Sequence, residues 1–231
     1  MTAASGAHGH GHGHAHGQAP GPGHGAGTAA PAALPVTASL DRASPLAAPR
    51  ATAAALPPLR RMAERPLSGK LALRGDPADA AFMAGAARAL GLALPTAPGT
   101  VAASGTGEAQ RAALWLGPNE WLALVPLAQE AALASALRAA LAGCHASVVE
   151  TGDERVCLAL TGADARSVLA KGCSLDLRPR SFAAGRCAQT VLARVNVLLW
   201  RSDAEGDPTF EILVRRSFAA WLHDWLVDAG A

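Results

Sequence analysis

The sequence predicts an α+β fold, in which antiparallel sheet packs with helices, and three observations lead to this prediction. Residues 1–60 are low-complexity Gly, His, Ala and Pro, whereas strand-like and helix-like segments alternate from Leu67 onward. Within the second part, Leu71-Ala72-Leu73-Arg74-Gly75 is echoed by Leu158-Ala159-Leu160-Thr161-Gly162, each time before a predicted helix. The echo favours two β-α-β-β-α-like halves, on one antiparallel sheet or on two packed sheets.

The first part of the chain, residues 1–66, is predicted to be a disordered tail and linker. Its composition buries too little apolar surface to offset the entropy of ordering a backbone. The linker is basic, with seven Lys/Arg against Asp41 and Glu64 over residues 41–75, so it either touches an acidic partner surface or is simply solvated. The tail's histidines could share a Ni²⁺, Cu²⁺ or Zn²⁺ ion or have only incidental metal affinity. They are His8, His10, His12, His14, His16 and His24.

The predicted domain covers residues 67–231, with possible sub-lobes at 67–150 and 151–231. In the first, Asp76 is the expected N-cap of a helix that has Pro77 at its first position and ends at Gly91. The other predicted segments are a strand Gly69–Arg74, a turn-rich stretch over 95–107, strands Arg111–Leu116 and Glu120–Val125, a helix Leu127–Ala142 and a strand Ala146–Glu150.

The second sub-lobe is predicted to follow the same plan. Its segments are a strand Arg155–Leu160, a helix Ala163–Ala170, a loop Lys171–Arg186, strands Cys187–Val195, Asn196–Arg201 and Phe210–Val214, and a closing helix Ser217–Asp228. The closing helix has an apolar stripe at helical spacing, formed by Phe218, Trp221, Leu222, Trp225 and Leu226. Such a stripe is typical of core and, because it is rich in Trp, also of an interface.

Composition excludes several classes of protein. A formal net charge of +2 gives no global attraction for nucleic acid or membrane, and nowhere do 18 apolar residues run together. The cysteines are Cys144, Cys157, Cys173 and Cys187. They contain no C-x-x-C pair, which argues against a zinc ribbon or a thioredoxin-type motif. Without an export signal at the start, they are predicted to be reduced thiols of a cytoplasmic protein.

No catalytic, cofactor-binding or metal-binding constellation is predicted in the domain. Ser104-Gly105-Thr106-Gly107 lacks the third glycine of a dinucleotide-binding loop. A hydrolase needs a nucleophile beside a base, and the domain offers only His145, which opens a strand, and His223, which lies opposite the apolar stripe of the closing helix. Both histidines are interpreted as structural or surface residues.

A basic loop is the main candidate for contact with a partner. Arg178, Arg180 and Arg186 lie with Lys171 around Asp176, and such cations hold anions or a partner's carboxylates. The alternative is a solvated loop in which Asp176 caps a local turn.

Tryptophans supply the further candidates. Trp221 and Trp225 on the closing helix belong to a residue type enriched at interfaces. Trp115 and Trp121 flank a tight turn, where they either cover a pocket or lie in the sheet core.

Four ordered blocks of sequence closely resemble the gamma subunit of heterotetrameric sarcosine oxidase. They are Leu116–Leu122 (LGPNEWL), Val168–Leu177 (VLAKGCSLDL), Gly185–Thr190 (GRCAQT) and Val214–Ala219 (VRRSFA). The resemblance extends from about Leu67 to the C-terminus, with Asn119 as a departure where the family has Asp. It implies an accessory, non-catalytic subunit packed mainly against the alpha subunit, with beta and delta subunits completing the heterotetramer. It also implies that FAD, FMN, NAD, tetrahydrofolate and zinc are held by those other subunits and that this chain holds no cofactor.

The gamma subunit family is in turn similar to the folate-binding fold of the glycine-cleavage T-protein, where an acidic pair in a G-G-x-x-D-D turn serves the folate. The corresponding stretch here, Leu192–Leu199, has neither the glycines nor a carboxylate, so productive folate binding is not expected. The hypothesis is therefore a gamma subunit that supports oxidative demethylation of sarcosine to glycine. The alternatives are a free-standing tetrahydrofolate-binding or aminomethyltransferase-like module and, third, a metal-handling protein that uses the histidine tract.

Overall fold

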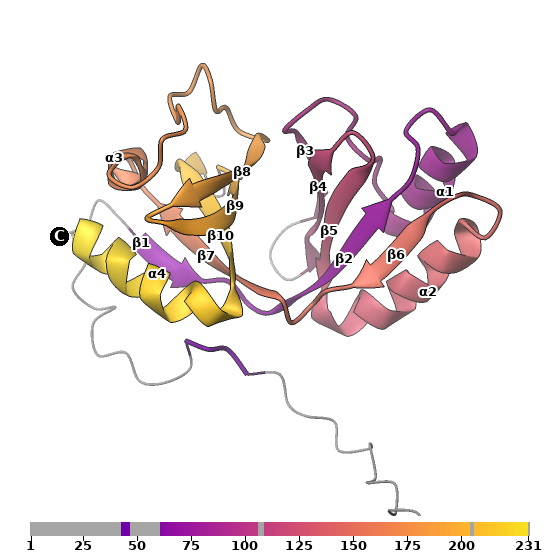
Figure 1. Cartoon of the computed structure of the whole chain (residues 1–231), viewed down its shortest axis with the longest axis horizontal. Helices are drawn as coiled ribbons and strands as arrows, with labels where there is room; N and C mark the ends of the chain where they lie inside the picture. The colour runs from indigo at the N-terminus through magenta and orange to yellow at the C-terminus, as the bar shows by residue number, and fades with distance from the viewer. Residues whose placement is uncertain (1–42, 47–60, 106–108, 204–205, 231) are drawn as a thin grey trace, which may run out of the picture. The chain divides into compact units, whose positions relative to one another are not determined.

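The computed structural model describes residues 43–46, 61–105, 109–203 and 206–230 (Figure 1). These residues belong to one compact unit that extends from Asp41 to Ala231. Their strands form two five-stranded sheets in which the paired strands are antiparallel, so the α+β prediction is confirmed in its two-sheet form. The predictions for the histidine-rich tail lie outside the described residues. Within the described ranges, no helix has both the length and the apolar character needed to cross a bilayer.

The first sheet has the strand order β3-β4-β5-β2-β6 and is packed with two helices. Its elements are β2 (Ser68–Arg74), α1 (Ala80–Leu90), β3 (Val101–Ser104), β4 (Arg111–Gly117), β5 (Glu120–Pro126), the 3-10 helix η3 (Leu127–Gln129), α2 (Glu130–Ala140) and β6 (Ser147–Glu150).

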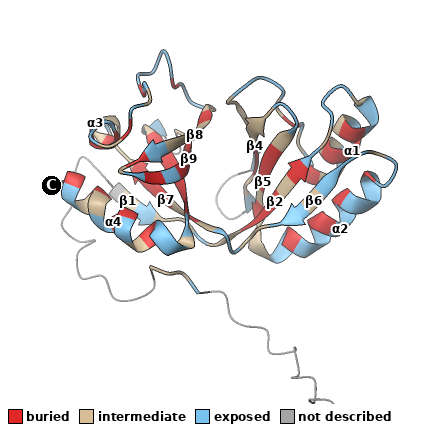
Figure 2. Ribbon diagram, in the orientation of Figure 1, coloured by how far each residue is buried: buried red, intermediate tan, exposed pale blue. Residues whose placement is uncertain are grey.

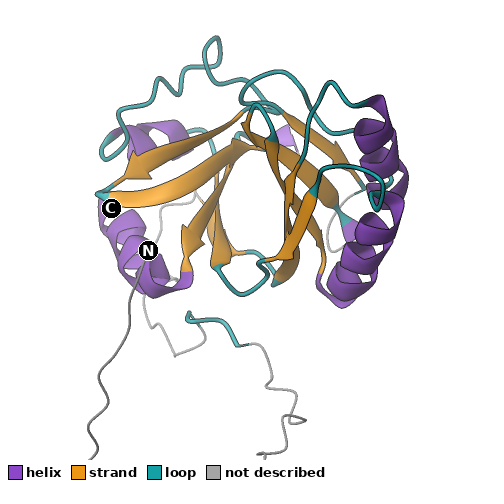
Figure 3. Ribbon diagram, turned by 45° about the vertical axis from the view of Figure 1, so that its right-hand side comes forward, coloured by secondary structure: helices purple, strands orange, loops and turns teal. Residues whose placement is uncertain are grey.

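The second sheet has the strand order β1-β7-β10-β9-β8. Its elements are β1 (Arg61–Glu64), β7 (Arg155–Thr161), α3 (Ala165–Ala170), β8 (Cys187–Leu192), β9 (Val195–Arg201), β10 (Thr209–Arg215) and α4 (Arg216–Gly230). In Figures 1 and 3 the helices lie on the outer side of each sheet, with the strands between them.

The two halves exchange one strand each. Along the chain, the series β1-β2-α1-β3-β4-β5-α2 has the same order of element types as the series β6-β7-α3-β8-β9-β10-α4, apart from η3. Each leading strand pairs in the other half, because β1 pairs with β7 and β6 pairs with β2. The predicted repeat is therefore confirmed, and each half has two strands more than the predicted β-α-β-β-α order: one at its start and one between its helices.

Two strands lie in segments that the sequence analysis assigned otherwise. β1 falls within the predicted linker, so the described domain begins at Arg61 instead of Leu67, and β3 falls within the predicted turn-rich stretch over 95–107. Both have four residues, lie at a sheet edge and contain few large apolar side chains. Such strands are formed by pairing with a neighbour, as Met62 does opposite Leu160, and leave little alternation to detect in the sequence.

The start of α1 differs from the prediction by three residues. Asp79, instead of Asp76, is the N-cap, because its Oδ1 accepts hydrogen bonds from the backbone N–H of Ala81 (2.8 Å) and of Phe82 (3.2 Å). The Oδ1 of Asp76 accepts from Ala78 N–H at 2.8 Å and so closes a turn before the helix. The predicted stop is confirmed, since Gly91 has the left-handed φ of 72°.

The predicted helix Leu127–Ala142 is divided into η3 and α2, since its second part docks closely on β2. A Cβ at Gly69 would come within 2.6 Å of the Glu130 Cβ, so only glycine allows this approach. The Oε1 of the buried Glu130 accepts the backbone N–H of the buried Lys70 at 2.9 Å. The Lys70 ammonium in turn donates to the carbonyls of Ser68 (2.8 Å) and Gly152 (3.3 Å), which joins the start of β2 to the connection that follows the exchanged strand β6.

Three apolar clusters hold these layers together (Figure 2). One packs the first sheet against α1 and α2 around Phe82 and Trp121, and a second packs the other sheet against α3 and α4 around Phe210 and Leu222. The third lies between the inner faces of the two sheets, where Leu114, Leu122, Leu198, Trp200 and Leu213 meet with other residues of β4, β5, β8, β9 and β10. Burial of this kind contributes about 25 cal/mol per Å² of apolar surface.

Candidate partner interface

The closing helix α4 is turned relative to the predicted stripe. Leu222 and Leu226 are buried as expected, but Phe218 is 48% exposed and Trp221 is 47% exposed. His223, predicted to lie opposite the apolar stripe, is buried instead, with an exposed fraction of 7%. The reason is the direct passage from β10 into α4 without an intervening loop, which fixes the rotation of the helix. Small residues such as Ala219 lie on the buried face of α4. Their spacing could have indicated this face, but the prediction followed the large apolar residues instead.

The two candidate tryptophans of α4 have different environments. Trp221 is on the surface, whereas Trp225 is half-buried and packs against the core of the second sheet. A Cβ at Gly172 would come within 2.7 Å of the Trp225 ring, so the ring lies directly on the backbone of the loop after α3. Trp225 is therefore part of the protein's own packing, and Trp221 is available to a partner.

A groove lies beside the exposed face of α4. We call it the hairpin groove, because the β8–β9 hairpin forms one wall, while the first turn of α4 and the neighbouring ends of β7 and β10 form the other. Its volume is about 590 Å³. The lining residues are Arg155, Gln189, Thr190, Val191, Arg194, Val195, Asn196, Val197, Leu198, Arg215 and Phe218. The groove was not predicted from the sequence, since its residues come from five separate elements and from the β8–β9 turn.

The turn of this hairpin has an unfavourable backbone. Its two central residues, Ala193 and Arg194, have φ of 48° and 69°. The hairpin has a two-residue loop, because Leu192 pairs with Val195, and positive φ at both loop positions defines a type I′ turn, which favours Asn and Gly. The predicted boundary between Val195 and Asn196 was wrong, because that turn chemistry is missing from the sequence.

Positive charge dominates the groove. Glu154 faces two of its three arginines, with its Oε1 at 3.4 Å from Arg155 Nη2 and 3.5 Å from Arg215 Nε. The guanidinium of Arg194 forms no hydrogen bond or ion pair with any residue in the described part of the chain. A surface with this excess of cations beside Val191 and Phe218 suits a ligand that has both a carboxylate and an apolar group.

In the loop Lys171–Arg186, which was predicted as the main partner contact, some polar side chains bind each other. Arg178 makes a two-pronged pair with Asp176 (Nε–Oδ1 2.7 Å and Nη2–Oδ2 2.6 Å), and Ser181 Oγ donates to the same carboxylate at 2.7 Å. Hydrogen bonds from Arg178 and Ser181 hold the pKa of Asp176 well below its usual range. Asp176 therefore does cap a local turn, which was the alternative for this loop.

The other two arginines of that loop differ from each other. Arg180 is exposed. Arg186 is half-buried at the junction of the sheets, where it forms an isolated bridge with Thr100. The structure thus leaves Arg180 as the candidate of this loop that is both exposed and outside the pair with Asp176.

Trp115 and Trp121 face each other across β4 and β5. Trp121 is fully buried, with its ring centre 5.7 Å from that of Phe82, and its Nε1–H donates to the carbonyl of Pro95 at 2.7 Å. Trp115 is half-buried against the same core. The interpretation as core residues is confirmed.

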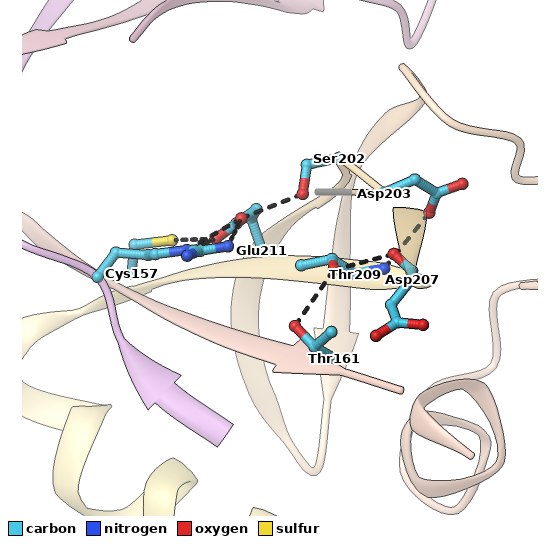
Figure 4. A network of polar contacts seen from close by, with 8 residues as sticks. Cys157, Thr161, Ser202, Asp203, Asp207, Thr209 and Glu211 are labelled. Carbon is cyan, nitrogen blue, oxygen red and sulfur yellow. Dashed lines mark hydrogen bonds and ion pairs between the residues drawn. The ribbon is translucent and has the colours of Figure 1, made fainter. Parts of the chain in front are cut away.

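A buried polar network lies on the second sheet (Figure 4). Glu211 is at its centre and accepts from Arg65 Nη2 (2.7 Å), Ser202 Oγ (3.1 Å) and Cys157 Sγ (3.4 Å). Burial, together with the charge of Glu211, raises the pKa of the Cys157 thiol well above its usual value. Because Arg65 lies between β1 and β2, this network fastens the exchanged strand β1 to the second sheet.

The described residues contain no group of three or more His, Cys, Asp or Glu placed to hold one metal ion.

Residues 74–231 match the family model described as the sarcosine oxidase, gamma subunit family. The chain belongs to this family.

Individual relatives agree with the family match. The chain is 39% identical over 171 residues to the sarcosine oxidase subunit gamma of Arthrobacter sp., covering 74% of this chain and 78% of that relative. It is 40% identical over 160 residues to the sarcosine oxidase subunit gamma of Corynebacterium sp. (strain P-1), covering 69% of this chain and 74% of the relative. The gamma subunit resemblance predicted from the four sequence blocks is confirmed.

Solved structures support the same family and its fold. A chain of the heterotetrameric sarcosine oxidase from Corynebacterium sp. U-96, in complex with pyrrole 2-carboxylate, matches with a TM-score of 0.72 and 36% identity, covering 82% of this chain and 94% of that one. The glycine cleavage system aminomethyltransferase T from Bartonella henselae matches with a TM-score of 0.55, covering 73% of this chain and 45% of that one. At 20% identity, the second match shows the fold alone. The predicted relationship to the T-protein fold is thus confirmed.

Proposed function

We propose that this gamma-family chain is an accessory subunit of a heterotetrameric sarcosine oxidase. In this role it supports the oxidative demethylation of sarcosine to glycine by stabilising the alpha subunit and adds no reacting group. The observation that carries the proposal is the agreement with a chain of such a heterotetramer over 94% of that chain's length, at 36% identity.

The proposal places alpha as the main contact, beta and delta as the remaining partners, and FAD, FMN, NAD, tetrahydrofolate and zinc in chains other than this one. The surface supports a role in assembly, because Phe218 and Trp221 are exposed and aromatic anchors of this kind dominate binding energy at interfaces. A cytoplasmic location accords with the four free cysteines of the described domain.

Co-expression of the four subunits, with an affinity tag on this chain, tests the proposal. We expect the purified material to contain the three companion subunits, to carry flavin absorbance and to oxidise sarcosine. Omitting this chain should lower the recovery and the Tm of the alpha subunit. Recovery of this chain as a lone monomer, with full activity in the three other subunits at unchanged Tm, would refute the proposed role.

The loop arginines form a separate part of this proposal. We expect Arg180→Glu to weaken assembly if the loop contacts a partner. Arg88→Glu is the matched control, since it reverses the charge of an exposed arginine on α1. Equal co-purification of both variants removes the loop from the interface.

The T-protein-like fold favours one other candidate function, a tetrahydrofolate-binding or aminomethyltransferase-like module. The stretch Leu192–Leu199 argues against it, because the fold places the β8–β9 turn there, with Arg194 and Asn196 and no carboxylate to accept the N–H donors of a pterin. Calorimetry of the isolated chain with tetrahydrofolate should show no binding heat, and micromolar binding would support the module.

A further inference from the structure

We infer that the hairpin groove is the docking site for a segment of a partner subunit that carries a carboxylate beside an apolar side chain. The inference rests on the proposed function and deepens it, because it names the surface through which this chain is held. Three independent features of the groove support it.

The first feature is exposed apolar surface. Among the described residues, four large hydrophobic side chains are exposed: Val149, Val191, Phe218 and Trp221. Val191 and Phe218 line the groove, and Trp221 lies one turn along α4 from Phe218, on a neighbouring part of the helix surface. Single exposed hydrophobic residues need no explanation, but a cluster of them beside a groove marks an interaction site.

The second feature is uncompensated charge. Arg155 and Arg215 share the single carboxylate of Glu154 at ion-pair distances of 3.4 and 3.5 Å, and Arg194 has no partner in the described part of the chain. A carboxylate placed between these arginines would gain charge-assisted hydrogen bonds, and the guanidinium groups are suited to two-pronged binding. Complementary charge of this kind determines which partner binds.

The third feature is the strained turn that presents Arg194. Ala193 and Arg194 adopt the left-handed conformation at φ of 48° and 69°, where Asn-Gly would be less strained. Strain that persists at a surface turn points to a function for the side chain that it presents. Here that side chain is the guanidinium of Arg194, which lines the groove.

These features also decide between possible occupants. A second copy of this chain, docked about a two-fold axis, would bring the same patch against itself and so place arginines against arginines. A nucleic acid backbone would match the charge but would leave Val191 and Phe218 without apolar contacts. A protein segment with a carboxylate and an apolar side chain matches both the arginines of the groove and its exposed apolar residues.

Site-specific crosslinking in the assembled complex tests the inference. A benzophenone-bearing amino acid replaces Val191 on the edge strand β8 or, as the matched control, Val149 on the edge strand β6; the two valines are 47% and 50% exposed. We expect irradiation to join this chain to a partner subunit from position 191 and not from position 149. Crosslinks from neither position, from both in equal yield, or between two copies of this chain would overturn the inference.

Charge reversal supplies a second measurement. Arg194→Glu should raise the apparent Kd of this chain for the other three subunits by about tenfold or more, whereas Arg88→Glu on α1 should leave it unchanged. The folded state of each variant is checked by its Tm. If the unaltered chain does not assemble at all, the proposed function fails. If it assembles and Arg194→Glu binds as well as Arg88→Glu does, only the groove is refuted.

Discussion

Replacing Arg194 by glycine should separate the stability of the β8–β9 turn from its function. Arg194 has φ of 69°, in the left-handed region where a side chain costs roughly 1–2 kcal/mol. Glycine removes that cost but adds about 0.5–1 kcal/mol of backbone entropy to the unfolded chain. No hydrogen bond to a described residue is lost, so the net expectation is a stabilisation of about 0.5–1 kcal/mol, or a rise in Tm of about 1–4 °C for a domain of this size.

The assay is urea and thermal unfolding of the isolated chain, followed by co-purification with the other subunits. Arg215→Gly is the control, because it removes a groove arginine from the end of β10, where glycine should lower stability by about 0.5–1 kcal/mol. We expect Arg194→Gly to be more stable than the unaltered chain and yet to assemble less well. A lower Tm for Arg194→Gly would refute the account of the turn, and unchanged assembly would contradict the role of its side chain.

Three further perturbations follow from contacts inside the domain. Arg65→Met should destabilise the fold by about 3 kcal/mol, because the buried Glu211 keeps its charge without the cation; urea unfolding should show part of this loss recovered in the double variant with Glu211→Gln. Gly172→Ala should cost about 1–3 kcal/mol through the 2.7 Å approach to the Trp225 ring, and a double-mutant cycle with Trp225→Ala should show strong coupling, whereas simple additivity would exclude that contact as the cause. Burial raises the pKa of the Cys187 thiol from 9.0 to about 11. The contribution of this group to the free energy of unfolding is therefore fully present below pH 9 and is lost as the pH rises toward 11, because the unfolded chain releases the thiol proton first. Measured unfolding free energies should thus depend less on pH between 9 and 11 in Cys187→Ala.

The sequence predicted the elements whose side chains repeat at a regular spacing. β2, β4, β5, β7 and β10 were found within one or two residues, because each is a seven-residue run that contains several apolar residues. The repeated order of elements was predicted from a five-residue echo in the sequence. β1 was missed because its formation depends on β7, a strand far away in the chain, which a local pattern does not record. β3 pairs with the next strand, β4, and was missed because its four residues contain few large apolar side chains.

The candidate interface was less predictable for the same reason. Trp221 was predicted both as part of the apolar stripe and as a candidate partner contact, and it lies on the surface. The rotation of α4 is fixed by the end of β10 and cannot be obtained from the helix sequence alone. The hairpin groove draws Arg155, Arg194 and Arg215 from three places in the chain. Only Arg215 belongs to one of the four blocks that resemble the family, and no sequence pattern links it to the other two, so only the tertiary structure brings the three arginines together.

The exchange of β1 and β6 has a consequence for how the molecule is made. As the chain is synthesised, β1 emerges first but has no neighbour until β7, about ninety residues later, has been translated. Neither half can complete its own sheet, so a cut between them would leave each fragment one strand short, with an open edge ready to pair with another molecule. The two halves therefore form an interlocked pair, and neither sheet is complete until strands of both halves have been synthesised.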